Sequence, residues 1–137
     1  MTPFRLEILT PDGVFFSGET DNIVVRTTVG DKGILARHEP YVAALTIGKF
    51  KVRIDGEFRF GAISSGVIKV DRDKTVILAD SCEWAEEIDL DRAVKAKELA
   101  EQKLEEFEKA DNDRGVAVAE YKLKRAINRI EAYKLKK

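Results

Sequence analysis

Residues 49–60 read KFKVRIDGEFRF, and this stretch decides the type of fold. Apolar and charged residues alternate before its centre, which is typical of a strand with one buried face. The apolar members of this first strand are Phe50, Val52 and Ile54. Asp55-Gly56 supplies the two residues of a type I′ turn, in which both positions need a positive φ. The pattern predicts a β-hairpin in which Phe58 and Phe60 continue the same apolar face on the return strand.

The segments on either side repeat this plan up to about residue 84. FRLEIL (4–9) alternates until the turn residues TPDG (10–13), and NIVVRTT (22–28) is rich in β-branched residues. GVIKVDRDKTVILAD (66–80) has the pattern of a second hairpin with a polar turn. Many short strands separated by turns, with no helical repeat between them, predict an antiparallel β-sandwich or a barrel.

Residues 85–137 have a different composition and a different period. They hold 26 of the 49 charged residues but only one of the nine glycines. Apolar side chains recur every three or four positions in two runs, which predicts two amphipathic helices joined as an antiparallel hairpin. These positions are Leu90, Ala93, Ala96, Ala100, Leu104 and Phe107, then Val116, Ala119, Leu123, Ala126, Ile127, Ile130 and Tyr133. The predicted fold class is α+β, mainly β, with a sandwich domain at 1–84 and a helical-hairpin domain at 85–137.

The overall charge and the rare residues exclude several classes of protein. A formal net charge of −1 excludes a strongly basic nucleic-acid or membrane-surface protein. No apolar run approaches the roughly 20 residues of a membrane helix, and no secretory signal pattern opens the chain, so we expect a soluble cytosolic protein without direct membrane insertion. Cys82 is the only cysteine and His38 the only histidine. We therefore expect no catalytic set, no metal site and no required cofactor.

Longer motifs indicate a family. GDKGILARHEPYVAALTIG (30–48) and AISSGVIKVDRDKTVILAD (62–80) lie in the predicted sandwich, and EWAEEIDLDRAVKAKELAE (83–101) leads directly into the helices. Along residues 3–135 this order of segments resembles the epsilon subunit of the bacterial F-type ATP synthase. One departure is Ala36-Arg37, where many members of that family have Pro-Gly.

The resemblance implies a non-catalytic subunit of the central stalk, or rotor, of a proton-translocating ATP synthase. Its sandwich would hold the gamma subunit and sit on the c-ring, and its helices would extend toward the alpha and beta subunits to inhibit ATP hydrolysis. The complex would lie at the cytoplasmic face of the cell membrane. A basic stripe on the second helix would meet acidic loops of the beta subunit. Its members are Lys122, Arg125, Arg129 and Lys136.

A second motif implies a regulatory ligand. Residues 88–93 match the I/L-D-x-x-R-A signature by which some epsilon subunits bind ATP. The resemblance implies that ATP contacts Glu83, Ile88, Asp89, Arg92, Ala93, Arg125 and Arg129. Guanidinium groups suit phosphate oxygens, and carboxylates accept hydrogen bonds from adenine or ribose. The alternative is that Asp89 only caps the first helix, with Arg92 as its i+3 partner.

Two other classes of function remain open from the residues alone. The first is a stand-alone ATP-sensing module, which the resemblance of the sandwich to a rotor subunit disfavours. The second is a nucleic-acid adaptor that uses the basic second helix. The near-zero total charge and the absence of aromatic residues interleaved with the basic ones argue against nucleic acid as a partner.

Overall fold

The computed structural model describes residues 2–136 and contains ten strands followed by helices. The strands are β1 (Phe4–Thr10), β2 (Gly13–Thr20), β3 (Ile23–Thr27), β4 (Gly30–Ile34), β5 (Tyr41–Leu45), β6 (Gly48–Ile54), β7 (Glu57–Ile63), β8 (Gly66–Val70), β9 (Lys74–Ala79) and β10 (Cys82–Trp84). A single 3₁₀ turn, η1 (Ala85–Glu87), leads into α1 (Leu90–Lys109) and α2 (Asp113–Tyr133).

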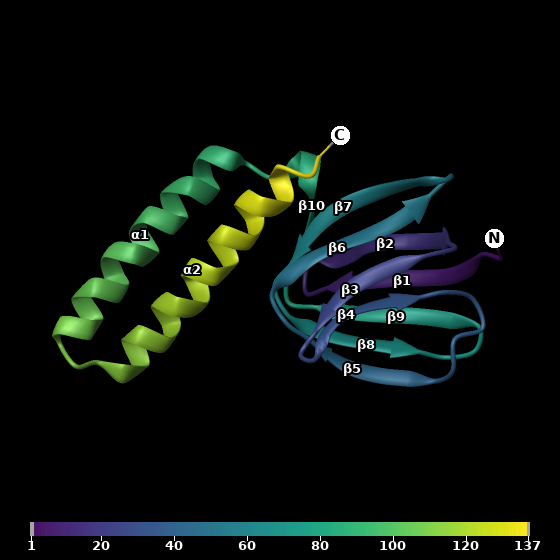
Figure 1. The fold of residues 1–137 in the computed structure, drawn as a ribbon, viewed down its shortest axis with the longest axis horizontal. Helices are drawn as coiled ribbons and strands as arrows, with labels where there is room; N and C mark the ends of the chain where they lie inside the picture. Colours follow the sequence, from purple (N-terminus) through teal and green to yellow (C-terminus); the bar gives the residue numbers. More distant parts are fainter. Residues whose placement is uncertain (1, 137) are drawn as a thin grey trace.

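The strands form one continuous sheet that folds over on itself. Their order is β10-β7-β6-β3-β5-β8-β9-β1-β2, and β4 lies off this path, paired with β3 along its whole length. Figure 1 shows the strands wrapped around a common interior and the two helices projecting from one end. This confirms the predicted sandwich followed by a helical hairpin. All strand pairs are antiparallel except β1 with β9, which is parallel.

The β6–β7 hairpin has the predicted turn but not the predicted apolar face. Asp55 and Gly56 have φ of 51° and 82°, as a type I′ turn requires. Lys51 pairs with Phe60 and Arg53 pairs with Phe58, so both phenylalanines lie on the face of the charged residues. The prediction that they share the face of Phe50 and Val52 is therefore wrong. A two-residue turn pairs even-numbered residues of β6 with odd-numbered residues of β7, which reverses the alternation across the turn.

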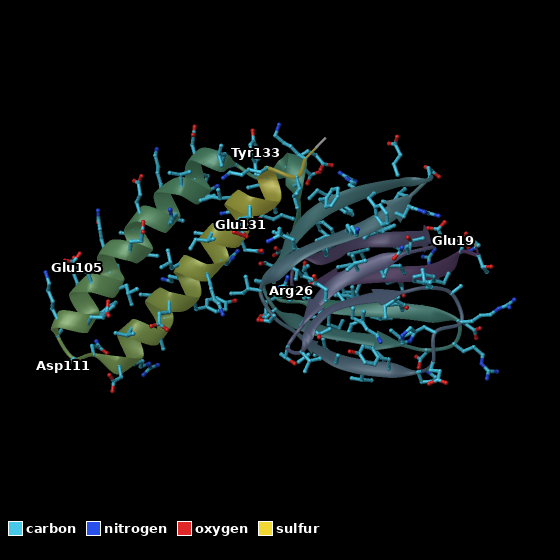
Figure 2. The ribbon with its side chains drawn as sticks, viewed as in Figure 1. Glu19, Arg26, Glu105, Asp111, Glu131 and Tyr133 are labelled. Carbon is cyan, nitrogen blue, oxygen red and sulfur yellow. The ribbon has the colours of Figure 1, made fainter. Side chains whose placement is uncertain are left out.

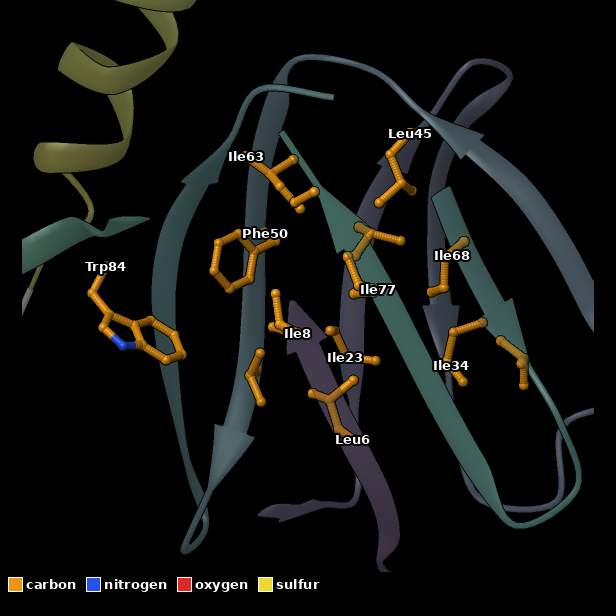
Figure 3. Packing of buried hydrophobic residues seen from close by; sticks show 14 residues of the cluster. Leu6, Ile8, Ile23, Ile34, Leu45, Phe50, Ile63, Ile68, Ile77 and Trp84 are labelled. Atoms are coloured by element: carbon orange, nitrogen blue, oxygen red, sulfur yellow. The ribbon is translucent and has the colours of Figure 1, made fainter. Parts of the chain in front are cut away.

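The core lies inside the folded sheet. Figure 3 shows aliphatic side chains from both layers meeting there, with Phe50 and Trp84 toward the end nearest the helices. Trp84 is 7% exposed and packs against Phe15, Phe16 and Phe50. All members of this buried cluster come from the strands. The sandwich therefore has a hydrophobic core that does not depend on residues of the helices.

The two helices begin with capping residues and turn sharply between residues 109 and 113. Asp89 caps α1 by accepting a hydrogen bond from the Arg92 N–H at 3.1 Å. Asp111 has a φ of 50°, and Asn112 caps α2 by accepting from the Gly115 N–H at 2.9 Å. Small buried side chains allow the helices to approach closely. These are Ala93 and Ala100 on α1, and Ala119 and Ala126 on α2.

Candidate functional site

Two of the predicted ATP-binding residues bind each other. Arg129 of α2 donates from Nε and Nη2 to the two carboxylate oxygens of Glu83 in β10, at 2.6 and 3.0 Å. The two side chains are 20% and 30% exposed, and this bidentate geometry is among the stronger forms of ion pair. In this structure the Glu83–Arg129 pair ties the end of α2 to the sandwich.

Three other predicted residues have structural roles at the start of α1. Ile88 is 4% exposed and packs with Ala62 of β7 and Ala132 of α2. Ala93 is completely buried. The carboxylate of Asp89 caps α1 as the alternative interpretation predicts, but among residues 2–136 the Arg92 guanidinium forms no ion pair with it.

The remaining two predicted residues are exposed. Neither Arg92 nor Arg125 has a carboxylate within 4 Å among residues 2–136. Arg125 lies one turn before Arg129 on α2, and Arg92 lies one turn before Ala96 on α1. These guanidinium groups are therefore free to meet an anion.

A groove of about 660 Å³ runs between the helices and includes Arg125 and Arg129. Its lining is apolar at the floor and basic at the rim, and among residues 2–136 it includes no carboxylate. The basic side chains are Lys103, Arg114, Lys122, Arg125 and Arg129. Lys136, the last member of the predicted basic stripe, lies beyond α2 with its ammonium group 4.7 Å from the centre of the Tyr133 ring. Three of the four stripe residues thus line one groove.

A second set of contacts holds α2 against the sandwich. Asn128 is 7% exposed, and its Nδ2 donates to the carbonyl oxygen of Gly48 in β6 at 2.9 Å. Glu131 accepts from the Lys49 ammonium group at 2.8 Å. Figure 1 places α2 between α1 and the sandwich, and Figure 2 shows Glu131 on the side of α2 that faces the sandwich. The hairpin is therefore attached through the C-terminal part of α2.

Sequence reasoning missed Asn128. The predicted apolar stripe included Ile127, but Ile127 is 36% exposed and its neighbour Asn128 is buried instead. The periodic pattern describes one packed face, whereas α2 packs against both α1 and the sandwich. The spacing of four residues puts Asn128 on the same helix face as Ala132, but a polar amide gives no apolar signal in the sequence.

We expect Asn128→Ala to loosen the attachment of the hairpin. The change removes a buried donor and leaves the Gly48 carbonyl without it, at a cost of about 1–3 kcal/mol. Hydrogen exchange of backbone amides in residues 126–133 should become about 5- to 150-fold faster. Gln102→Ala, which truncates an exposed amide on α1, serves as the matched control. Equal protection in the two variants would show that Asn128 does not hold the hairpin.

A row of apolar side chains crosses the outer face of the sheet. The register pairs Ala44 with Val67, Val67 with Leu78, Leu78 with Leu9, and Leu9 with Val14. Val67, Leu78 and Val14 are 42%, 54% and 65% exposed. Exposed apolar residues are ordinary when scattered, but a contiguous row over five strands is typical of a protein interface.

The single cysteine and the single histidine, the residues most often reactive in enzymes, have ordinary structural surroundings. Burial raises the pKa of the Cys82 thiol, which disfavours the reactive thiolate. His38 Nδ1 lies 2.7 Å from the carbonyl oxygen of Glu39. Within residues 2–136 no group of three or more His, Cys, Asp or Glu side chains is arranged to hold a metal ion. Neither of the two helices has the length and apolar character needed to cross a bilayer.

The structure combines a sandwich that has its own core, a pair of helices packed on it, and an apolar row on the outer face of the sheet. This combination is typical of a subunit of a larger complex. Family models match both parts: the beta-sandwich domain of the ATP synthase delta/epsilon chain over residues 3–85, and its long alpha-helix domain over residues 86–134. The chain belongs to the family of ATP synthase epsilon chains, which are non-catalytic subunits of the complex.

Relatives and solved structures agree with this assignment. The chain is 44% identical over 132 residues to an ATP synthase epsilon chain from Ruminococcus albus, covering 95% of this chain and 96% of that one. It is also 44% identical over 130 residues to one from Caldicellulosiruptor saccharolyticus, with coverages of 95% and 93%. The fold is similar to a chain of the Euglena gracilis mitochondrial ATP synthase, with a TM-score of 0.80, 24% identity, and coverages of 93% and 79%.

Proposed function

We propose that this subunit works in the central stalk of a proton-translocating ATP synthase. The sandwich contacts the gamma subunit and the c-ring and transmits rotation during ATP synthesis. The helical hairpin inhibits ATP hydrolysis when it leaves the sandwich and extends toward the alpha and beta subunits. The subunit acts as a peripheral component at the cytoplasmic face of the membrane, without entering the bilayer.

The attachment of the hairpin carries this proposal. The buried core of the sandwich includes only residues from the strands, so the helices can leave without opening it. Few contacts hold α2 in place: the bonds of Asn128, Arg129 and Glu131, and the small cluster of Ala62, Ile88 and Ala132. Segments with few buried apolar contacts open at low free-energy cost. We therefore assign the hairpin as the moving part, and place the boundary between the domains at residues 84 and 85.

The outer row of the sheet is our candidate surface for the gamma subunit. Val67 and Leu78 lie near its centre on adjacent strands, where a partner would bury both. The five residues of the row are all apolar, and interfaces between permanent subunits are apolar in the same way.

We also propose that ATP binds the closed hairpin as a regulatory ligand. Arg125 and Arg129 line one end of the interhelical groove, and helical spacing brings Arg92 to the same end. Only the closed form brings the start of α1 beside the later part of α2. A ligand that binds one state stabilises it by RT ln(1 + [L]/Kd), or about 2.7 kcal/mol at a hundredfold excess over Kd. Falling ATP would then release the hairpin and prevent wasteful hydrolysis.

The test of ATP binding is calorimetric titration of the full chain. Arg125→Ala removes a guanidinium group without a carboxylate partner among residues 2–136, so the variant should fold normally. Loss of a charge-assisted hydrogen bond of about 1.5–3 kcal/mol corresponds to a 10- to 150-fold weaker Kd for ATP. Lys124→Ala, a neighbouring exposed cation outside the groove, is the control and should leave Kd unchanged. Absence of binding heat at millimolar ATP in the wild type would refute this part of the proposal.

A further inference from the structure

We infer that Arg59 of β7 holds the 3₁₀ turn η1 on the sandwich, so that the hairpin moves about a two-residue hinge at Ile88 and Asp89. The inference rests on the proposed movement of the hairpin and names its point of rotation. By composition η1 belongs with the helices, because the boundary falls between residues 84 and 85. The contacts of Arg59 attach η1 to the strands instead.

Arg59 contacts the end of β10 and η1 at the same time. Its guanidinium carbon lies 4.0 Å from the centre of the Trp84 ring, which is the geometry of a cation–π contact. Its Nε donates to Oε1 of Glu86 at 2.5 Å, and Nη2 lies at the same distance from that oxygen. A weaker approach of 3.7 Å joins Nη2 to Glu87. Because the guanidinium plane is rigid, the stacked group loses little further freedom when it forms the ion pair.

The backbone before η1 is fixed to the same strand. β10 pairs with β7 from Cys82 to Trp84, and Ala85 is completely buried. At Gly61 of β7 the two strands approach so closely that an added Cβ would overlap the carbonyl oxygen of Glu83. None of these contacts includes a residue of α1 or α2. They therefore remain in place when the hairpin leaves the sandwich.

Ile88 and Asp89 link η1 to α1 and can rotate without breaking either element. Both have an extended backbone, with φ and ψ of −72° and 130° at Ile88 and of −81° and 100° at Asp89. The Ile88 N–H donates to the Ala85 carbonyl and closes η1. The Ala93 N–H donates to the Asp89 carbonyl and belongs to α1. The ψ bond of Ile88 and the φ bond of Asp89 lie between these two hydrogen bonds, and residues at the ends of elements commonly absorb such rotations in hinges.

A fixed η1 gives the hairpin a short tether. Ile88 also packs on Ala62 of β7, a contact that stays when Ala132 of α2 leaves. The two hinge residues span at most about 7 Å. Release of η1 would lengthen the tether to the five residues 85–89, which span up to about 18 Å. Arg59 therefore limits how far the start of α1 can move from the sandwich.

The experiment measures distances in the full chain by double electron–electron resonance between two spin labels. One label is attached at Arg72→Cys, in the exposed turn between β8 and β9. The second is attached at Glu87→Cys in η1 or at Lys95→Cys on the exposed side of α1. Each protein also carries Cys82→Ala, which removes the native thiol, and Asn128→Ala, which loosens α2. Labelling position 87 leaves the shorter ion pair of Arg59, with Glu86, intact.

Without nucleotide, we expect one narrow distance between positions 72 and 87 and a broad distribution between positions 72 and 95. Arg59→Gln should broaden the first distribution by up to about 10 Å, because the tether grows from two residues to five. Arg26→Gln is the matched control, since it breaks an exposed arginine–carboxylate pair, with Asp31, away from η1. It should leave the distance between positions 72 and 87 narrow.

The other outcomes separate the hinge from the moving hairpin. If both distributions are broad in the protein with Arg59 intact, the hinge lies before η1 and our inference is wrong, while the hairpin does move. If Arg59→Gln leaves the distance to position 87 narrow, Arg59 is not the residue that holds η1. If both distances stay narrow in every variant, the hairpin does not leave the sandwich, and the proposed function fails together with the hinge.

Discussion

Replacing Leu78 with glutamate should prevent the subunit from binding gamma while leaving its fold intact. Leu78 is 54% exposed on the outer face of β9, so the isolated protein can hydrate the new carboxylate. In a complex that covers the apolar row, the carboxylate would be buried between Val67 and Leu9. An uncompensated buried charge costs about 3–5 kcal/mol, which corresponds to binding that is weaker by roughly 100-fold to several thousand-fold.

Co-purification with gamma and surface plasmon resonance would measure this loss. Val94→Glu is the matched control, because it places the same charge at a 37% exposed valine on α1, away from the sheet. Both variants should unfold thermally as the wild type does. If Leu78→Glu binds gamma as tightly as Val94→Glu, the apolar row is not the gamma interface.

Removal of the helices should raise ATP hydrolysis by the complex several-fold and leave ATP synthesis largely intact. A chain that ends after Glu87 keeps all ten strands and the buried core of the sandwich. It lacks Ile88, Asn128 and the whole of α1 and α2, so it has nothing that can reach the catalytic subunits. Rotation passes through the sandwich in our proposal, whereas inhibition needs the hairpin.

The assay compares complexes reconstituted with the full-length chain and with the truncated one, matched for bound epsilon subunit. Hydrolysis is measured at low ATP, where little of the proposed ligand is bound to the hairpin and inhibition by the full chain is greatest. Synthesis driven by a proton gradient is measured on the same preparations. Equal hydrolysis in both complexes under inhibiting conditions would contradict the switch, and loss of synthesis would place torque transmission in the hairpin.

The fold class could be predicted from the sequence because the patterns that mark strands, turns and helix starts depend only on residues that are close together in the chain. Alternation in residues 49–60 and the turn at Asp55-Gly56 predicted the β6–β7 hairpin, and Asp89 predicted the start of α1. The prediction of the face of Phe58 and Phe60 was wrong because the length of the turn decides which residues of the two strands lie opposite each other. With two residues in the turn, Phe58 lies opposite Arg53 and Phe60 opposite Lys51. Apolarity alone does not indicate which face a residue occupies.

The candidate site was predictable in its residue types but not in its partners. The signature at residues 88–93 and the arginines of α2 predict an anion-binding hairpin, and Arg125 and Arg129 line the groove between its helices. The bond between Glu83 and Arg129 joins residues 46 positions apart, and the bond between Asn128 and Gly48 joins residues 80 positions apart. Periodicity within one element contains no information about such distant pairs.

The sequence by itself determined the elements of this protein: the strands with their turns, the two helices with their caps, and the change of composition near residue 84. Each of these depends on backbone preference and on the spacing of apolar side chains within a few residues. Only the tertiary structure decided how these elements pack against one another. At Gly66, for example, β8 lies so close to β9 that an added Cβ would lie 2.0 Å from the carbonyl oxygen of Leu78. It also placed α2 against the sandwich. Those contacts join segments that are far apart in the sequence. They form only when apolar side chains are buried, backbones approach closely and opposite charges pair in the same packed arrangement.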